Sequence, residues 1–521
     1  MCASAQDVKD DAPMVFIPPG EFVMGTSQQE ADGLAKEYGV HPTYFLTETP
    51  KQTVNLKGFL IDKYPVTNRQ YKKFVDETRK HMPRGWVNGA YPEGTDDHPV
   101  TNMAWQGAEA YAAWAGKRLP TAEEWEKAAR GADGRRFPWG NEWDADATRT
   151  DDPTSAQTRA LTTPVGCFQK GASPYGVMDL CGNVAEWTGT PSSPADPARG
   201  WAWYVVKGAG GAHSMRMNFR CAAVNFSAHT SRAHPWLGFR CAKDCDAPPA
   251  GLPEDKTPAR TPPPIPPAKG TDPERYGKEP IRIQVAKGWA NAAFEVPYFP
   301  EARFSLFCPE QSGAKDVPLS WTGDRPKFDW TVNEDRTEAS YQCTFEGKAV
   351  QTITLKSGMD YVDYTIAIKN LTDKTFTGVG TNSCFNNSGA VYFDNTERNR
   401  SYVWTDDGAT CMTQMPIGGK GEPLHGGWGV AKPGEKAPKG GNRARHPFIF
   451  IVSRDGQWTI AQAHGEGTSV ASNAHYSCLH SRPSWPDIPP GEQRSVTGKM
   501  YFLKGGPQDL FERWKKDFQK P

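Results

Sequence analysis

Residues 173–188 read SPYGVMDLCGNVAEWT, a stretch that combines turn-forming residues with a large aromatic ring at Trp187. Other short motifs of the same half carry further tryptophans, which are Trp105, Trp114, Trp125, Trp139 and Trp143. A buried indole N–H needs a hydrogen-bond acceptor, and loops offer backbone carbonyls that can accept it. With 51 Gly and 45 Pro in 521 residues, much of the chain is turn and loop. We therefore expect these rings to pack in the core of a loop-rich domain.

Short helices are marked by their capping sequences. Residues 67–70 (TNRQ) and 121–124 (TAEE) both fit the capping box, in which two side chains bond the exposed N–H groups of a helix start. Asn102 is expected to cap a further helix, because the apolar residues that follow recur at helical spacing. Strand and loop fill the remainder, so the sequence predicts an α+β fold with much irregular structure.

A proline-rich segment divides the chain. Ten prolines fall between Pro248 and Pro273, a composition that forms a stiff extended spacer and cannot hold a core. Each side is long enough for one core of its own. The predicted organisation is an exported tail over 1–13, a first domain over 14–246, a linker over 247–273 and a second domain over 274–521.

The second half is rich in β-forming residues. The runs YVDYTIAI at 361–368 and FIFIV at 448–452 are typical of strands, and turn signals follow both. Only residues 507–518 carry a helical stripe. We expect a large antiparallel β-sandwich closed by a C-terminal helix.

Charge and hydropathy argue against two classes of partner. The 60 Lys and Arg balance 60 Asp and Glu, so the broad attraction to nucleic acid that basic proteins rely on is missing. The longest apolar run, FIFIV, is far shorter than the roughly 20 residues that cross a bilayer. We expect neither nucleic-acid binding nor a membrane span.

The first residues indicate export. Ala3-Ser4-Ala5 has the small-x-small shape of a signal cleavage site, which predicts a secreted or cell-envelope protein. One alternative is that Cys2 carries the lipid anchor of a lipoprotein. Another is an ordinary cytosolic N-terminus.

An ordered series of motifs identifies the first half. Its members are PPGEF at 18–22, GFLIDKYPVTNRQYKKFV at 58–75, AWAGKRLPTAEEWEKAARG at 113–131, FPWGNEW at 137–143, the opening stretch at 173–188, and GFRCA at 238–242. Over residues 14–244 the chain resembles the sulfatase-modifying-factor family, whose founding activity is that of the formylglycine-generating enzyme. The resemblance implies that family's C-type-lectin-like fold.

The resemblance also implies calcium. The family places an ion at the segment that reads GNVAEW here, where Asn183 and Glu186, with backbone oxygens such as that of Val184, offer hard oxygen ligands. The same residue types also serve in plain turn hydrogen bonding. A second family calcium loop falls after FPWGNEW, where this chain has Asp144, Asp146 and Asp151 in place of the usual asparagine pattern.

The chain departs from the enzyme at the position of its chemistry. Formylglycine-generating enzymes oxidise a sulfatase cysteine with O₂ and a copper ion held by two cysteines, and the matching stretch 207–220 (KGAGGAHSMRMNFR) contains none. Without thiolates for Cu(I), formylglycine generation is not expected. In relatives that form disulfides with the cysteines equivalent to Cys221 and Cys241, the partner cysteines fall at positions that are Ala112 and Ala129 here. Any disulfides of this chain are therefore expected to use other cysteines, which are Cys167, Cys181 or Cys245.

The first half offers one other pattern that could hold a metal. His213, Met215 and Met217 alternate, so an extended backbone would place an imidazole and two thioethers on one face, a set that can hold Cu(I). The alternative is that the methionines pack inward and His213 lies at a polar rim. The His-x3-His-x-Glu motif of iron-dependent family branches does not occur in the sequence.

The second half offers weaker signals. His475 and His480 lie five residues apart, with Asp487 and Glu492 nearby, which would allow an acid/base pair or a metal site if these groups converge. Trp404, Trp428 and Trp485 lie close to Gly, Asp and His, and as exposed rings they would suit stacking on sugars. Scattered surface histidines and core tryptophans are the alternative. The strand pattern also resembles galactose-mutarotase-like sandwiches.

These observations predict an exported two-domain protein that lacks formylglycine chemistry and acts as a binding or scaffold module for a glycan or protein ligand. Calcium is the expected cofactor, and copper is a second possibility. The alternative functions are a divergent metal-dependent oxidase, centred on His213, and a carbohydrate-active enzyme that uses the second domain, centred on His475 and His480.

Overall fold

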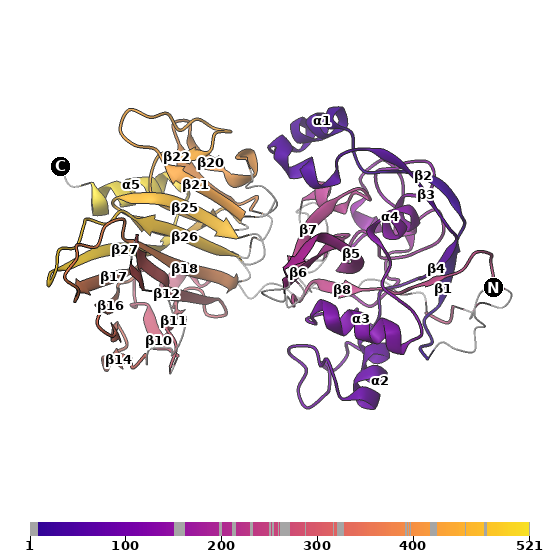
Figure 1. Cartoon of the computed structure of the whole chain (residues 1–521), viewed down its shortest axis with the longest axis horizontal. Coiled ribbons are helices and arrows are strands. Elements are labelled where there is room, and N and C mark those ends of the chain that lie inside the picture. The colour runs from indigo at the N-terminus through magenta and orange to yellow at the C-terminus, as the bar shows by residue number, and fades with distance from the viewer. Residues whose placement is uncertain are drawn as a thin grey trace. The chain divides into compact units, whose positions relative to one another are not determined.

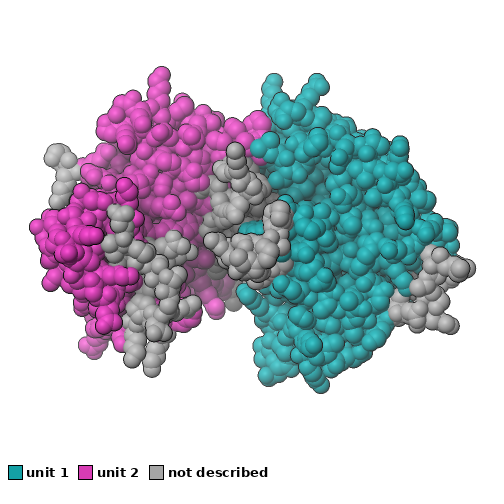
Figure 2. All heavy atoms as spheres, in the orientation of Figure 1, with its two compact units in different colours: residues 1–38, 44–268 teal, residues 39–43, 269–521 magenta. Residues whose placement is uncertain are grey.

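The computed structural model describes residues 9–150, 162–196, 201–210, 215–229, 233–249, 252, 255–258, 260, 271–286, 288–315, 317–319, 328–390, 393, 395, 398–416, 425–453, 455–473 and 477–519. The backbone divides into two compact units (Figure 2). Unit 1 comprises residues 1–38 and 44–268, and unit 2 comprises residues 39–43 and 269–521. Across the described residues, every helix is too short or too polar to span a bilayer.

Unit 1 is built from short strands joined by long loops (Figure 1). Three small sheets are present: β1-β4-β9, β2-β3 and β7-β6-β5-β8. Their strands are β1 (Met14–Ile17), β2 (Gly20–Met24), β3 (Gln52–Leu56), β4 (Phe59–Asp62), β5 (Ala185–Asp196), β6 (Trp201–Lys207), β7 (Val224–His229), β8 (Leu237–Phe239) and β9 (Ala242–Asp244). The β5–β8 pair is parallel and the other pairs are antiparallel.

The helices of unit 1 are short, and two begin as the sequence predicts. They are α1 (Gln28–Tyr38), α2 (Asn68–Thr78), α3 (Trp105–Trp114) and α4 (Ala122–Arg130), with 3-10 turns η2 (Pro42–Glu48), η3 (Ala145–Ala147), η4 (Gln169–Gly171) and η5 (Arg216–Phe219). Both capping boxes are confirmed, because Thr67 and Thr121 each accept the N–H three residues on and receive the reciprocal bond. The expected cap at Asn102 is wrong: α3 begins after Ala104 with no side-chain cap. Asn102 instead adopts a left-handed turn conformation with φ of 61°.

Tryptophans form much of the core of unit 1, as expected. Trp125 and Trp187 are fully buried, and Trp105 is nearly so. The indole N–H of Trp105 donates to the backbone carbonyl of Thr188 at 2.9 Å. That of Trp125 donates instead to the carboxylate of Glu186 at 2.8 Å. A loop carbonyl therefore satisfies one of these rings and a buried carboxylate another, whereas the Trp187 N–H is buried without a hydrogen-bond partner in the described part of the chain.

Unit 2 contains two nine-stranded sheets. Sheet A has the order β10-β11-β12-β18-β26-β25-β21-β22, with β13 also paired to β12. Its strands are β10 (Arg282–Val285), β11 (Asn291–Glu295), β12 (Arg303–Ala314), β13 (Val317–Leu319), β18 (Gly380–Gly389), β21 (His425–Val430), β22 (Arg443–Ala444), β25 (Gly467–Asn473) and β26 (Cys478–Pro483).

Sheet B has the order β14-β15-β16-β17-β27-β24-β23-β19-β20. Its strands are β14 (Thr331–Val332), β15 (Glu338–Phe345), β16 (Ala349–Ser357), β17 (Tyr361–Asn370), β19 (Ser401–Thr405), β20 (Gly408–Cys411), β23 (Phe448–Val452), β24 (Trp458–His464) and β27 (Gln493–Lys504). Two 3-10 turns, η6 (Pro273–Arg275) and η7 (Met412–Gln414), complete the connections.

The two sheets share one hydrophobic core, which confirms the predicted sandwich. Phe385 and Leu479 contribute from sheet A, and Ile353 and Ile366 from sheet B. Strands alternate between this core and the opposite face because successive side chains point to opposite sides of a sheet. The predicted C-terminal helix, α5 (Pro507–Phe518), buries its apolar stripe in a second cluster with strands of sheet B.

Candidate functional sites

The loop before β5 holds a buried carboxylate that the sequence reasoning missed. Asp179 is almost completely buried, and its Oδ2 accepts the Gly166 N–H at 2.8 Å. Burial raises the pKa of Asp179 to about 6; Gly166 and Arg240 oppose this shift, whereas the charge of Glu186 adds to it. Among the described residues Asp179 forms no ion pair. An acidic residue four positions before Asn183 was the available signal in the sequence.

Glu186, an expected calcium ligand, already has a full set of protein partners. Its Oε2 accepts from Arg240 Nε at 2.7 Å and from Trp125 Nε1 at 2.8 Å. Its Oε1 accepts from Arg240 Nη2 at 2.8 Å. The Arg240 guanidinium therefore neutralises the charge of this carboxylate. This arrangement does not fit the expectation that the Glu186 side chain binds a calcium ion.

Asn183 is likewise engaged by backbone. Its Oδ1 accepts the Thr163 N–H at 2.9 Å, and its Nδ2 donates to the Thr163 carbonyl at 3.1 Å. The hydroxyl of Thr163 is buried without a hydrogen-bond partner. Val184 follows Asn183, and its N–H donates to the Gly182 carbonyl at 2.9 Å, so Val184 offers only its own carbonyl. The side chains of Asn183 and Glu186 are thus both engaged by protein groups, whereas the Thr163 hydroxyl is a hard oxygen donor without a partner.

In the described part of the second expected calcium loop, Asp144 and Asp146 are engaged by local groups. Asp144 Oδ1 accepts the N–H of Asp146 at 2.8 Å, a local turn bond. The two carboxylates lie 3.8 and 3.6 Å from Lys170 Nζ, which is exposed. Asp151 lies outside the described residues. The described part of this loop thus resembles a charged surface turn.

The three tryptophans proposed for sugar stacking are not exposed. Trp428 is only 1% exposed and belongs to the sandwich core. Trp404 is also buried and stacks on Phe511 with ring centroids 4.2 Å apart. Trp485 is partly buried and donates to the Thr381 hydroxyl at 3.1 Å. The expectation of exposure is wrong for Trp404 and Trp428, because alternation along β19 and β21 turns these rings toward apolar clusters, whereas Trp485 follows the end of β26 and is only partly buried.

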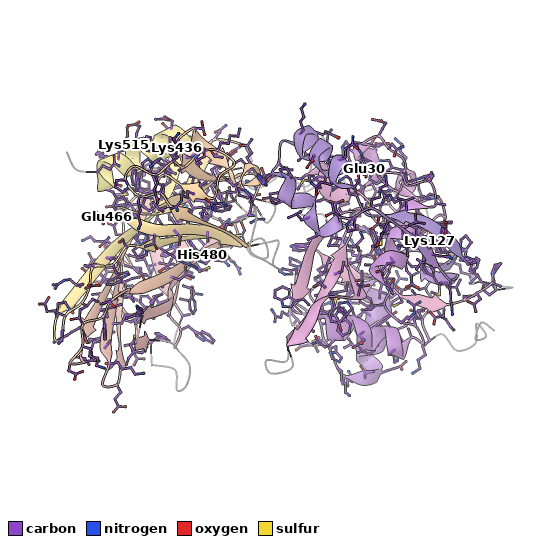
Figure 3. The ribbon with its side chains drawn as sticks, turned by 45° about the horizontal axis from the view of Figure 1, so that its top comes forward. Glu30, Lys127, Lys436, Glu466, His480 and Lys515 are labelled. Carbon is purple, nitrogen blue, oxygen red and sulfur yellow. The ribbon has the colours of Figure 1, made fainter. Side chains whose placement is uncertain are left out.

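The structure describes one of the two candidate histidines of unit 2. His475 lies outside the described residues, while His480 on β26 is 4% exposed (Figure 3). Its Nε2 lies 3.2 Å from Cys478 Sγ. Asp487 is exposed, and Glu492 pairs with Arg494. The sequence neighbours Asp487 and Glu492 are thus an exposed carboxylate and an ion-paired one, whereas the described contact of His480 is with a cysteine.

A groove lies on the face of sheet A that points away from the core. Its cavity volume is about 1030 Å³, and its lining includes Arg282, Gln284, Glu295, Arg303 and Asn386. Glu295 pairs with Arg336 at 2.8 Å. Arg303 is exposed, with no ion pair or hydrogen bond to another side chain in the described part of the chain. The groove therefore presents charged donors and acceptors to solvent.

Comparison with known proteins assigns the first half. Residues 2–245 match the model of the sulfatase-modifying factor enzyme 1-like domain. The formylglycine-generating enzyme of Thermomonospora curvata is 35% identical, in an alignment covering 44% of this chain and 93% of that protein. The chain belongs to this family.

Other members of the sulfatase-modifying factor family differ in activity. The inactive C-alpha-formylglycine-generating enzyme 2 of Bos taurus is 31% identical, covering 46% of this chain and 90% of that protein. Hercynine oxygenase of Mycolicibacterium smegmatis is 33% identical over 34% of this chain, which spans only 46% of that protein. Among solved structures, a galactose mutarotase related enzyme from Lactobacillus acidophilus is 8% identical, with a TM-score of 0.26, covering 43% of this chain and 98% of that one.

The segment around Met215 and Met217 has a different structure from the one that the copper hypothesis required. Met217 lies in the 3-10 turn η5 and is buried, while Met215 directly precedes that turn. An alternating face needs extended backbone, so the expected shared face of Met215 and Met217 is wrong. His213 lies outside the described residues.

The described cysteines of unit 1 are buried. Cys181 and Cys221 are hydrogen-bonded to each other, and burial raises the pKa of the Cys181 thiol well above its usual range. Burial has the same effect on the pKa of Cys241. Cys245 is disulfide-bonded, whereas Cys221 and Cys241 carry thiols. Raised pKa values leave such thiols protonated and unreactive.

Proposed function

We propose that this chain is an exported protein in which a formylglycine-generating-enzyme-like domain, with the C-type-lectin-like fold, serves as a scaffold without formylglycine chemistry. The second domain binds a glycan or protein ligand. The observation that carries the proposal is the absence of any cysteine between Lys207 and Arg220, where the family's catalytic pair belongs. The existence of an inactive relative in Bos taurus supports it.

Formylglycine formation is the direct test. The full chain is incubated with a cysteine-containing sulfatase peptide, Cu(I) and O₂, and the peptide is examined by mass spectrometry for the aldehyde. The Thermomonospora curvata enzyme serves as the positive control. We expect aldehyde only with the control enzyme; aldehyde formation by this chain would overturn the proposal.

The hercynine oxygenase relative gives the alternative of a divergent oxidase a specific basis. The same incubation without peptide, followed by an oxygen electrode in the presence of thiol substrates, separates the two functions. A scaffold consumes no more O₂ than buffer with the same metal. Sustained, protein-dependent O₂ consumption would favour the oxidase.

The groove of sheet A is the proposed ligand site. Arginine guanidinium groups donate in a planar fork and carboxylates accept, which together suit the hydroxyl pairs of a sugar. Binding of oligosaccharides to the whole protein, measured by calorimetry, should weaken in Arg303→Ala. The control is Arg494→Ala, a partly exposed arginine of sheet B that lies outside the groove lining. Equal binding by wild type and Arg303→Ala would place the ligand elsewhere.

Calcium is proposed as a structural ion of unit 1. Its support is the buried Asp179 without a described ion pair and the unsatisfied Thr163 hydroxyl, which are hard oxygen donors beside the family's calcium segment. When bound, calcium would neutralise Asp179. Elemental analysis after dialysis against calcium should detect it in the wild type and less in Asp179→Asn.

A further inference from the structure

Two cysteines and one histidine of unit 2 come together on a single sheet face. β18 and β26 are antiparallel neighbours, with Phe385 opposite Leu479 and Asn386 opposite Cys478. Continuing this register places Cys384 opposite His480. Cys478 precedes His480 by two residues, so both point to the same side of β26. The three side chains thus share the face opposite to Phe385 and Leu479, which lie in the sandwich core.

The geometry suits one metal ion. One ligand atom from each of Cys384, Cys478 and His480 lies within 4.8 Å of the other two. A tetrahedral zinc ion with bonds of roughly 2.0 to 2.3 Å would hold its ligand atoms roughly 3.5 to 3.8 Å apart. The described separation of 3.2 Å between Cys478 Sγ and His480 Nε2 is already close to that spacing. Small side-chain rotations are enough to complete the set.

The chemistry of the ligands selects the kind of ion. Two thiolates and an imidazole are soft and borderline donors, which favour Zn²⁺ or Cu⁺ over calcium or magnesium. Cys478 is 1% exposed, and a thiolate so buried needs a positive partner. Cys384 is half-buried and provides a route of entry.

A disulfide fits this arrangement less well. Cys384 is directly opposite His480 and only diagonal to Cys478 in the ladder. Diagonal neighbours in antiparallel sheets lie roughly 7 to 8 Å apart at Cα, beyond the usual span of a disulfide. Both residues carry thiols in the structure.

We propose that Cys384, Cys478 and His480 bind a thiophilic metal ion, Zn²⁺ or Cu⁺, in unit 2. The site lies on the same sheet face as the groove, because Asn386, which pairs with Cys478, contributes to the groove lining. Three protein ligands leave a tetrahedral ion with one position for an external group. The proposal is independent of the calcium site and of the scaffold function of unit 1.

The experiment titrates the untagged, reduced and metal-stripped full chain with Co²⁺ as a probe for zinc, and with Cu⁺ against a chromophoric Cu⁺ chelator. We expect one tight site, with sulfur-to-cobalt charge-transfer absorption for the zinc-type ion or removal of copper from the chelator for the copper-type ion. Cys384→Ser, a nearly isosteric change at a half-buried position, should weaken binding by at least roughly a hundredfold. His480→Ala should also remove the tight site.

Cys411→Ser is the matched control, since Cys411 is another half-buried thiol of unit 2 whose described contacts are Arg398, Asn399 and Thr413. It should bind as the wild type does. Circular dichroism of each variant verifies folding, and Cys384→Ser alone decides the outcome if His480→Ala unfolds. The proposal is overturned if wild type and Cys384→Ser bind equally, or if thiol counting and mass show a Cys384–Cys478 disulfide that persists as the protein's stable form.

Discussion

The two units treat buried polar groups differently. Unit 1 buries complete ion pairs, such as Lys117 with Asp10 and Asp62, at 2.6 and 2.7 Å. Unit 2 places a neutral network at the centre of its sandwich. There His464 lies 3.3 Å from the Tyr364 hydroxyl and 2.9 Å from that of Ser481. A loop-rich fold and a sheet fold of similar length therefore use different chemistry inside.

The reason lies in the backbone. Ladders satisfy most N–H and C=O groups of a sandwich, so its side chains can be apolar. Loops leave some backbone carbonyls without a backbone N–H partner, and cationic side chains can donate hydrogen bonds to these carbonyls. Arg240 donates to the carbonyls of Asp62, Lys63 and Met178. Lys127, labelled in Figure 3, donates to the carbonyls of Pro18 and Gly20. Both distances are 2.8 Å.

Among the tests of this contrast, acidification should have the largest effect. It lowers the stability of unit 2. Burial lowers the pKa of His464 from 6.5 to about 3. The unfolded chain binds a proton below pH 6.5 that the folded state excludes, so stability present above pH 6.5 is lost as the pH falls toward 3. Complete titration corresponds to about 5 kcal/mol. Amide exchange in β24 should report the loss, and His464→Gln should flatten it; an unchanged slope in that variant would assign the effect elsewhere.

Breaking a buried ion pair should be nearly as costly, but in unit 1. Arg240→Met leaves the Glu186 carboxylate buried without its partner, with an expected loss of about 3 to 5 kcal/mol in the free energy of unfolding. Arg513→Met is the control in unit 2, because the Arg513–Asp360 pair, at 3.0 Å, is partly exposed and should contribute about 1 kcal/mol or less. Urea unfolding measures both. Similar losses for the two variants would remove the distinction between the units.

Asp179 should give unit 1 a pH dependence of the opposite sign. Its folded pKa of about 6 exceeds the ordinary 3.8, so stability present below pH 3.8 is lost as the pH rises through 6. When a chelator removes calcium, the loss in the free energy of unfolding amounts to about 3 kcal/mol. Calcium should reduce it by binding the anion, and Asp179→Asn should abolish both effects. If calcium does not change the melting temperature of the wild type at pH 8, the calcium proposal is contradicted.

The smallest expected effect concerns a helix start. Thr121→Ala removes the hydroxyl that accepts the Glu124 N–H at 3.2 Å, with an expected cost of about 1 kcal/mol to unit 1. Thr121→Ser keeps the acceptor and should retain most of the stability. Equal losses in the two variants would mean that packing of the Thr121 methyl, rather than capping, is responsible. Thermal unfolding of the full chain measures the difference.

Local signals in the sequence were sufficient for much of the fold. The capping boxes at Thr67 and Thr121 and the stripe of α5 involve contacts within one helical turn, and the structure confirms them. Asn102 shows the limit, because a capping residue type can equally adopt a left-handed turn. The exposure of Trp404 and Trp428 could not be predicted, since it depends on which sheet face each strand buries.

The sequence by itself determined the family, the division near the proline-rich segment and the absence of cysteines where formylglycine chemistry needs them. These are properties of composition and ordered motifs, which require no coordinates. Only the tertiary structure decided that Arg240 and Trp125 occupy Glu186 while Asp179 has no described ion pair. It also decided that Cys384 faces His480 and Cys478, because strand pairing joins residues that are far apart in the chain and have no mutual signature within it.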